Sequence, residues 1–225
     1  MGVENAESYI GRKEKDYRMS DDLGNRMKLI EGQESDRRFM STLPICCRLD
    51  GKCFSSFTKE LQRPYDKIFA DLMVETTLYL VEETNACVGY TQSDEISLIY
   101  YSEDPKSQVF FDGRIQKMCS VLASMCSVKF NQLMRIMVDR MNVFYVGSKE
   151  EYESTEHNLW KKKLDLNPIF DCRVWIVPSK VEAVNNLVWR ENDCYKNSIS
   201  MAASEYYSDK ESFNLEKKSS AFRQG

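Results

Sequence analysis

The chain has 225 residues, of which 42% are hydrophobic, and its formal net charge is −4 at pH 7. This length allows one large domain or two small ones, and the acidic balance excludes a uniformly basic nucleic-acid-binding protein. No apolar run approaches the roughly 20 residues that span a bilayer, so we expect no membrane partner. Since residues 1–20 contain no apolar signal segment either, we expect a cytoplasmic protein.

The first third of the chain predicts a helical lead-in, a strand and a helix. Residues 1–40 are highly charged, and Gly24 and Gly32 are expected to break any long helix there. The apolar run 44–51 ends at Asp-Gly and predicts a buried strand. A helical pattern then opens at Pro64 and extends to residue 84, with proline in the first turn.

The rest of the chain predicts a hairpin, two helices and a strand. The β-rich runs 86–91 and 96–101 are separated by four residues, which indicates a hairpin. A long helical pattern follows over 110–141, then an alternating strand pattern over 170–177 and a final helical face over 182–207.

The element order is β-α-β-β-α-β with helical additions at both ends, which is typical of a ferredoxin-like α+β fold. We accordingly predict an antiparallel sheet with helices on one face. As domains we expect a charged helical lead-in over residues 1–40, a sheet-containing domain over 41–180, and a helical extension with a polar tail over 181–225.

The cysteine and histidine content excludes several kinds of site. Most of the eight cysteines fall within apolar periodic segments, and no C-x-x-C pair occurs. We therefore expect reduced, mostly buried thiols that pack as small hydrophobic groups. The single histidine, His157, gives no zinc-finger spacing and argues against a His-based catalytic triad or a His-rich metal site.

Charge changes sign in the middle of the chain. Residues 71–105 contain eight acidic residues and no Lys or Arg, whereas residues 106–149 contain seven basic residues and two acidic ones. An acidic block beside a basic one suits a metal site next to a polyphosphate site. Two solvated helix faces would produce the same pattern, so charge alone leaves both interpretations open.

The predicted topology brings two carboxylates together. The first and third strands of such a fold are antiparallel neighbours, so the end of the first lies beside the start of the third, where Asp50 and Asp94 stand. Paired carboxylates repel each other unless a cation lies between them, and hard oxygen ligands suit Mg²⁺ or Mn²⁺. The Gly51 carbonyl is a further potential ligand, and a two-metal arrangement would activate a hydroxyl and stabilise leaving pyrophosphate. The alternative is that both aspartates are ordinary turn residues.

Basic residues elsewhere suit a bound phosphate. Arg114 and Lys117 are three residues apart in the first turn of a predicted helix, whose N-terminus favours anions. Arg63 and Ser93 are candidates to supplement them, and surface charge is the alternative explanation. Three further lysines precede the fourth strand in a predicted loop, where they would either contact RNA phosphates or be solvated: Lys161, Lys162 and Lys163.

Five sequence blocks, in order along the chain, resemble one enzyme family. They are RLDGKCFSSF, GYTQSDEIS, FFDGRIQKMCSVLASM, FDCRVWIVPS and WRENDCYKNSISMAA. Through them the chain resembles the tRNA-histidine guanylyltransferase family, most of all its bacterial and archaeal branch of guanylyltransferase-like 3′–5′ polymerases. The resemblance extends from about residue 22 to residue 207 and so covers most of the chain.

The resemblance implies a polymerase-like palm as the catalytic domain, here residues 41–180, which adds nucleotides to the 5′ end of tRNA in a template-dependent way. An RNA 5′-monophosphate is activated with ATP or GTP, and the 3′-hydroxyl of an incoming nucleotide then attacks it. On the family pattern Asp50, Gly51 and Asp94 hold two Mg²⁺ ions, and Glu95 has a supporting catalytic role. The implied nucleotide-binding residues are Arg63, Ser93, Arg114, Lys117, Arg173, Asn197 and Ser198, the last two near a second nucleotide or the RNA end.

Some positions depart from the family pattern. Ser55 and Asp209 stand where the family often has His, and YKNSISM replaces the block tied to strict addition of G to histidine tRNA. We therefore favour 5′-end repair of truncated tRNAs, and the family implies a homotetramer. Two alternatives stay open: a class III cyclase-like palm that makes cyclic nucleotides, and a non-catalytic tRNA-binding module.

Overall fold

The computed structural model describes residues 21–104, 106–147 and 155–207, and the side chains of 143–147 lie outside the described set. The polar tail with Asp209 and the first 20 residues of the lead-in are likewise outside it. By its internal contacts the chain divides into two compact units, residues 1–37 and residues 38–225.

The described part of the first unit is helix α2 (Asp22–Ser35). Its start is capped by Asp21, whose side chain accepts a hydrogen bond from the Gly24 backbone at 2.8 Å. The 14-residue helix runs through both Gly24 and Gly32, contrary to the expectation that these glycines break it. None of the described side chains of α2 is buried.

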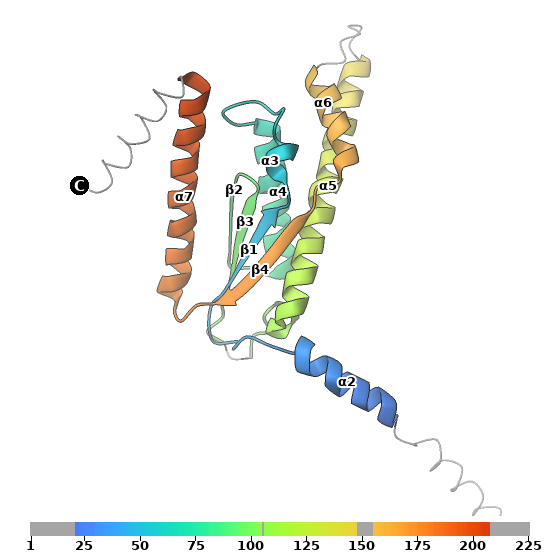
Figure 1. Cartoon of the computed structure of the whole chain (residues 1–225), viewed down its shortest axis with the longest axis vertical. Helices are drawn as coiled ribbons and strands as arrows, with labels where there is room; N and C mark the ends of the chain where they lie inside the picture. Colours follow the sequence, from blue (N-terminus) through green and yellow to red (C-terminus); the bar gives the residue numbers. More distant parts are fainter. Residues whose placement is uncertain (1–20, 105, 148–154, 208–225) are drawn as a thin grey trace, which may run out of the picture. The chain divides into compact units, whose positions relative to one another are not determined.

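The second unit is built on a four-stranded antiparallel sheet (Figure 1). Its strands are β1 (Ile45–Gly51), β2 (Val88–Gln92), β3 (Glu95–Tyr100) and β4 (Phe170–Ile176), in the spatial order β2-β3-β1-β4. Its helices are α3 (Phe54–Phe57), α4 (Lys67–Thr84), α5 (Ile115–Gly147), α6 (Thr155–Lys163) and α7 (Lys180–Tyr206), with short 3-10 turns η1 (Phe110–Gly113) and η2 (Leu164–Leu166). β1 and β3 are adjacent at the centre of the sheet, which confirms the predicted α+β topology.

Alternation of side chains gives the sheet two different faces. On one face Ile45, Cys47 and Leu49 of β1 belong to the main core, which includes buried residues of α4 and α5. On the other face Cys46 of β1 packs against Ala183 of α7. The predicted helices on one face are therefore α4 and α5, and the C-terminal addition α7 covers part of the opposite face (Figure 1).

Aromatic rings fill the core near the end of β1. The ring centroid of Phe54 in α3 lies 5.8 Å from that of Phe130 in α5 and 4.9 Å from that of Phe170 in β4. Trp160 is completely buried, with its ring centroid 6.2 Å from that of Phe57. We predicted a loop in this region, but Trp160 gives residues 155–163 an apolar side that anchors helix α6 to the core.

Helix α4 begins at Lys67 rather than at Pro64 because Asp66 caps it. The buried Asp66 carboxylate accepts a hydrogen bond from the backbone N–H of Phe69 at 2.9 Å. Residues 62–66 therefore remain outside the helix and border the site described below. Among the described helices, none combines the length and the apolar character needed to cross a membrane.

Candidate functional site

The sheet face on which α7 packs carries its side chains in three rows, with one residue from each strand in each row. The row at the end of β1 is mostly acidic and consists of Gln92, Glu95, Asp50 and Asp171. The next row contains two arginines and consists of Tyr90, Ser97, Arg48 and Arg173. The third row is apolar and consists of Val88, Ile99, Cys46 and Trp175. Strand alternation therefore places carboxylates at the edge of the sheet with positive charge directly behind them.

The turn between β2 and β3 adds another carboxylate to this edge. Gln92 pairs with Glu95, so the connection is the two-residue turn Ser93–Asp94 rather than the predicted four-residue one. Ser93 has a φ of 49°, the left-handed conformation that tight hairpin turns require. Its hydroxyl donates a hydrogen bond to Asp94 Oδ1 at 3.1 Å, which helps to fix the carboxylate.

The structure brings Asp50 and Asp94 together, as the strand order predicted. The backbone N–H of Gly51 donates a hydrogen bond to the Asp94 carbonyl oxygen at 3.1 Å and ties the end of β1 to the turn. Burial raises the pKa of Asp94, the Asp50 charge also raises it, and hydrogen bonds from its own backbone and Ser93 oppose this. Glycine is required at position 51 because a Cβ there would lie 2.3 Å from Cδ2 of Phe54.

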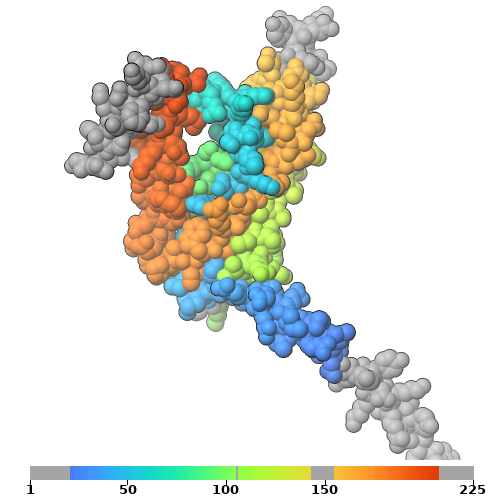
Figure 2. Space-filling view, in the orientation of Figure 1, coloured from blue at the N-terminus to red at the C-terminus, as the bar shows by residue number. Residues whose placement is uncertain are grey.

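Both carboxylates line a cavity of about 370 Å³ between the sheet edge, the segment before α4 and the second half of α7. Figure 2 shows a hollow between the upper part of α7, in red, and the cyan segment around α3. Seven of the predicted site residues line the cavity, namely Asp50, Arg63, Ser93, Asp94, Glu95, Asn197 and Ser198.

Three of the five carboxylates that line the cavity are already engaged. One caps α4, and the other two bind the same arginine of α7; in order, these are Asp66, Glu95 and Asp193. The remaining two are Asp50 and Asp94. Asp50 is 3.9 Å from the exposed guanidinium of Arg173, and Asp94 accepts its side-chain hydrogen bond from Ser93. The pair is therefore the part of the cavity that is available to a cation.

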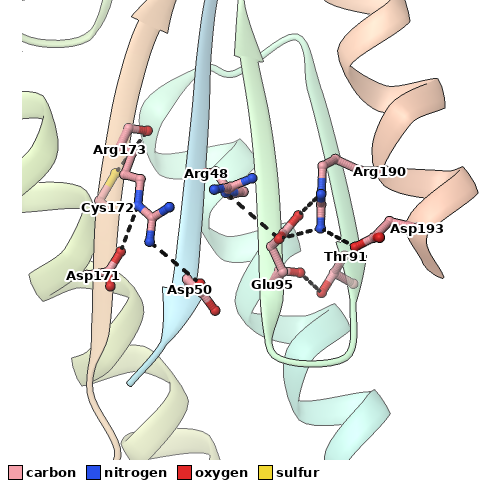
Figure 3. A network of polar contacts seen from close by, with 9 residues as sticks. All are labelled: Arg48, Asp50, Thr91, Glu95, Asp171, Cys172, Arg173, Arg190 and Asp193. Carbon is pink, nitrogen blue, oxygen red and sulfur yellow. Dashed lines mark hydrogen bonds and ion pairs between the residues drawn. The ribbon is translucent and has the colours of Figure 1, made fainter. Parts of the chain in front are cut away.

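Glu95 is held by α7 (Figure 3). Arg190 Nε and Nη2 donate to its two carboxylate oxygens at 2.6 and 2.8 Å, and Nη2 also donates to Asp193 at 3.0 Å. Arg48 Nε lies 3.9 Å from the same carboxylate. Burial lowers the pKa of Arg190, but the bonds to Glu95 and Asp193 outweigh it and raise the value. Both oxygens of Glu95 thus face arginines, which makes it a poor metal ligand.

Arg173 faces the carboxylate row from β4. Its Nη2 lies 3.9 Å from Asp50 Oδ2, and its Nε lies 3.7 Å from Asp171 Oδ1 (Figure 3). The side chain of Arg173 is 56% exposed, so these contacts are weak and hold it loosely. Arg173 is therefore beside the carboxylate pair and free to turn towards a bound phosphate.

Arg114 and Lys117 lie at the opposite end of the sheet. Arg114 immediately precedes α5, and Phe110 just before it stacks on Tyr100, the last residue of β3. Asp94 instead precedes the first residue of β3, so the length of the strand, about 20 Å, separates the two regions. The cause is topological, because a helix that follows β3 starts where β3 ends. Arg114 and Lys117 are not among the described residues that line the cavity, so the structure does not unite them with the carboxylates in one chain.

The three consecutive lysines do not form one RNA-facing loop. They are the last residues of α6, where successive side chains point about 100° apart. Lys161 and Lys162 are exposed, whereas Lys163 is buried and donates a hydrogen bond to the carbonyl oxygen of Phe57. Burial lowers the pKa of Lys163. The prediction that Lys163 contacts RNA is therefore wrong, since its ammonium group faces the protein interior.

Comparison with known proteins places this site in a family. The sequence profile described as tRNAHis guanylyltransferase matches residues 24–178. This chain belongs to the tRNAHis guanylyltransferase family. An uncharacterised protein of Acanthamoeba polyphaga mimivirus is 34% identical over 191 residues, which make up 80% of this chain and 62% of the viral protein. The tRNA(His) guanylyltransferase of Schizosaccharomyces pombe is 25% identical over 182 residues, or 78% of this chain and 58% of the yeast protein. The chain thus spans less than two thirds of the length of these relatives.

Solved structures of the tRNAHis guanylyltransferase family share the fold. A bacterial guanylyltransferase-like protein in complex with GTP is 30% identical, superposes with a TM-score of 0.68, and is matched over 88% of this chain and 76% of its own. The complex of such a bacterial protein with ATP gives 30% identity and a TM-score of 0.69 over 87% and 76% of the two chains. The Saccharomyces cerevisiae enzyme, at 20% identity and a TM-score of 0.56 over 78% and 68% of the two chains, supports the fold alone.

The carboxylate pair of this family member fits a magnesium ion. Within the described parts of the chain, no cluster of three or more His, Cys, Asp or Glu residues is arranged to hold a metal. Magnesium rarely needs such a cluster, because it takes one or two protein carboxylates and completes its shell with water and substrate phosphate. Burial raises the pKa of Asp94, and the Asp50 charge adds to this, so a cation beside the pair would favour the charged carboxylate.

Sequence reasoning missed three charged residues of the site. Arg48 and Asp171 were recognisable, because alternation places residue 48 on the same face as Asp50, and pairing of β4 with β1 places residue 171 opposite it. Arg190 lies in the block WREND, which supported the family resemblance, but its partner Glu95 is 95 positions away. Only the packing of α7 on the sheet reveals that pair.

Proposed function

We propose that this chain is a magnesium-dependent nucleotidyltransferase that adds nucleotides to the 5′ end of tRNA in the 3′–5′ direction on a template. The observation that supports this most is the cavity beside Asp50 and Asp94. The chain belongs to a family in which bacterial guanylyltransferase-like proteins have been solved in complex with GTP and with ATP. At about 370 Å³ the cavity is in the range of pockets that enclose small ligands, about 300–1,000 Å³.

Asp50, Asp94 and the carbonyl oxygen of Gly51 would hold Mg²⁺, as two ions. When bound, magnesium supplies positive charge that polarises the phosphate and stabilises the leaving pyrophosphate. The contribution of the chain is to hold two carboxylates side by side on a rigid sheet edge. Because one of them is partly buried, its charge interacts strongly with whatever cation or phosphate enters the cavity.

Residues around the pair would position the substrates. Arg63 in the cavity wall and Arg173, 3.9 Å from Asp50, would bind the triphosphate as charge-assisted hydrogen-bond donors, and the Ser93 hydroxyl would assist them. Asn197 and Ser198 line the α7 wall and would contact the second nucleotide or the RNA end. Arg114 and Lys117 would contact the same nucleotide only if another copy of the chain presented them.

Addition of a nucleotide to the RNA 5′ end would take place in two successive steps at the same site. In the first, the 5′-monophosphate of the RNA displaces pyrophosphate from ATP or GTP and becomes activated. In the second, the 3′-hydroxyl of an incoming nucleoside triphosphate attacks that activated phosphorus, and the nucleoside monophosphate leaves. Both steps move charge at the RNA 5′ phosphate, so the same carboxylate pair, Asp50 and Asp94, would serve both.

The RNA partner would be tRNA, with truncated 5′ ends favoured over strict addition of G to histidine tRNA. Lys161 and Lys162 are exposed on α6 and would contact RNA phosphates. The protein would be a homotetramer in the cytoplasm and would bind RNA across its subunits.

The test is a 5′-extension assay with the full chain, Mg²⁺, ATP, all four nucleoside triphosphates and a tRNA that lacks its first nucleotide. We expect the RNA to lengthen at its 5′ end, and Asp50→Ala to abolish both activation and addition. Cyclic product from ATP or GTP without RNA would indicate the cyclase alternative instead. Tight tRNA binding without metal-dependent turnover would indicate a binding module.

A further inference from the structure

Helix α7 changes its role along its 27 residues. Its first turns are attached to the sheet by apolar contacts, in which Ala183 and Leu187 pack with Cys46 and Ile99. From Asp193 onwards it borders the cavity instead, through side chains that include Cys194, Asn197, Ser198 and Met201. Arg190 lies at the junction between the attached part and the part that forms the cavity wall.

Arg190 belongs to a compact group of four side chains, the Glu95 clamp, made of Glu95, Arg48, Arg190 and Trp189. The guanidinium groups of Arg190 and Arg48 lie 4.6 and 5.6 Å from the Trp189 ring centroid, and both arginines face the Glu95 carboxylate. The side chains of Arg190 and Glu95 are 9% and 12% exposed, so water screens their attraction little. The planar guanidinium matches the carboxylate with two parallel hydrogen bonds, which fixes orientation as well as distance.

The clamp connects the two sides of the cavity. On one side, Glu95 is the first residue of β3 and directly follows Asp94 in the sequence. On the other side, Asp193 shares Nη2 of Arg190 and lies one helical turn before Asn197. Movement of Arg190 would therefore shift the α7 wall relative to the carboxylate pair.

We propose that Arg190 and Glu95 are positioning residues that set the distance between the α7 wall and the Asp50–Asp94 pair. Both residues line the cavity, but their charged groups are bonded to each other, so the clamp acts through the residues it holds in place. This inference rests on the proposed function in one respect, since it takes the cavity to be the nucleotide site.

The test compares Arg190→Gln, Glu95→Gln and the double variant with wild type, with Arg190→Lys as the conservative variant. Lys180→Gln is the matched control, because Lys180 also ties α7 to the preceding part of the chain, by an exposed ion pair with Glu103. The readouts are binding of Mn²⁺ alone by electron paramagnetic resonance, binding of ATP, and amide hydrogen exchange over residues 191–201.

We expect each single Gln variant to weaken ATP binding by about tenfold and to leave Mn²⁺ binding within about twofold of wild type. The double variant should be no worse than either single variant, because both remove the same contact. Arg190→Lys should recover part of the ATP affinity, and hydrogen exchange should accelerate over 191–201 in the Gln variants but not in Lys180→Gln.

Two results would overturn the proposal. Loss of Mn²⁺ binding in Glu95→Gln but not in Arg190→Gln would make Glu95 a metal ligand. Unchanged ATP affinity or unchanged exchange over 191–201 in Arg190→Gln would show that the clamp positions nothing. None of these assays needs RNA. A wild-type protein that binds ATP but does not extend tRNA would therefore contradict the proposed function, and the ATP-binding and exchange measurements would still test the clamp. If wild type bound no ATP, the exchange measurement would decide the clamp.

Discussion

Asp50 and Glu95 are directly opposite each other in the β1–β3 ladder, yet their surroundings give them different roles. Two arginines enclose Glu95, and the nearer one donates to both carboxylate oxygens. Asp50 meets a single exposed guanidinium, that of Arg173, at 3.9 Å. The same row of the sheet therefore contains a structural carboxylate and a carboxylate that is open to a cation.

Replacing Asp94 by Asn should stabilise the metal-free protein at pH 7 and abolish Mn²⁺ binding. Burial and the Asp50 charge raise the pKa of Asp94 above its usual 3.8, so the folded protein favours the protonated carboxyl group. The protonated Asp94 carboxyl group therefore contributes to folding stability. This contribution is complete at pH values below the pKa of Asp94 in the unfolded chain, and it is lost as the pH rises through the pKa of Asp94 in the folded protein. The advantage of Asp94→Asn should thus be present at pH 7 and vanish below about pH 3.8. Urea denaturation at both pH values measures it, and equal stability of the two proteins at pH 7 would contradict it.

Arg173→Gln should separate metal binding from nucleotide binding. Removing the guanidinium 3.9 Å from Asp50 takes away a competing positive charge, so Mn²⁺ alone should bind up to about threefold more tightly. ATP should bind about tenfold more weakly, because a charge-assisted contact with the triphosphate is lost. Calorimetric titration with Mn²⁺ and with ATP tests both, with Lys67→Gln on the exposed start of α4 as the control. A change of the same sign for both ligands would refute the assigned position of Arg173.

Arg63→Ala and Lys117→Ala should differ in their effect on ATP affinity. Arg63 lines the cavity, so its loss should weaken ATP binding by about tenfold. Lys117 lies over the Phe111 ring at the other end of the sheet, so its loss should change the affinity by less than about twofold. Equal weakening in both variants would mean that Lys117 reaches the cavity of another copy of the chain.

The consecutive lysines at the end of α6 should separate by stability. Lys163→Ala should lower the free energy of unfolding by about 1–3 kcal/mol, because it removes a buried donor and leaves the Phe57 carbonyl oxygen unpaired. Lys162→Ala on the exposed side should change it by less than about 0.5 kcal/mol. Thermal or urea denaturation distinguishes them, and equal losses would show that the burial of Lys163 has no energetic consequence.

The sheet and its carboxylate pair were predictable because strand periodicity and element order are local patterns with a fixed geometric consequence. The strand pattern around Asp50 and the hairpin around Asp94 are sufficient to place both residues at one edge. The same reasoning could have excluded Arg114 and Lys117, since the helix after β3 must start at the far end of that strand.

The remainder depends on packing between distant segments. Helix α6 forms because Trp160 is buried against Phe57, a contact more than 100 positions apart that no local pattern signals. The pairing of Arg190 with Glu95 likewise requires α7 to lie on the sheet at one particular rotation. Charge patterns indicated that acids and bases were present, but not which acids were already neutralised.

We propose that Asp50 and Asp94 share a divalent cation next to the phosphates of a nucleotide. A crystal structure of the full chain with Mn²⁺ and a non-hydrolysable ATP analogue tests it most directly, through the anomalous signal of manganese. We predict an anomalous peak about 2.1 Å from oxygens of both carboxylates and of the analogue's phosphates, with Arg63 in contact with the triphosphate. An analogue bound elsewhere, or bound in the cavity with no manganese between Asp50 and Asp94, would show that the two carboxylates do not form the metal site.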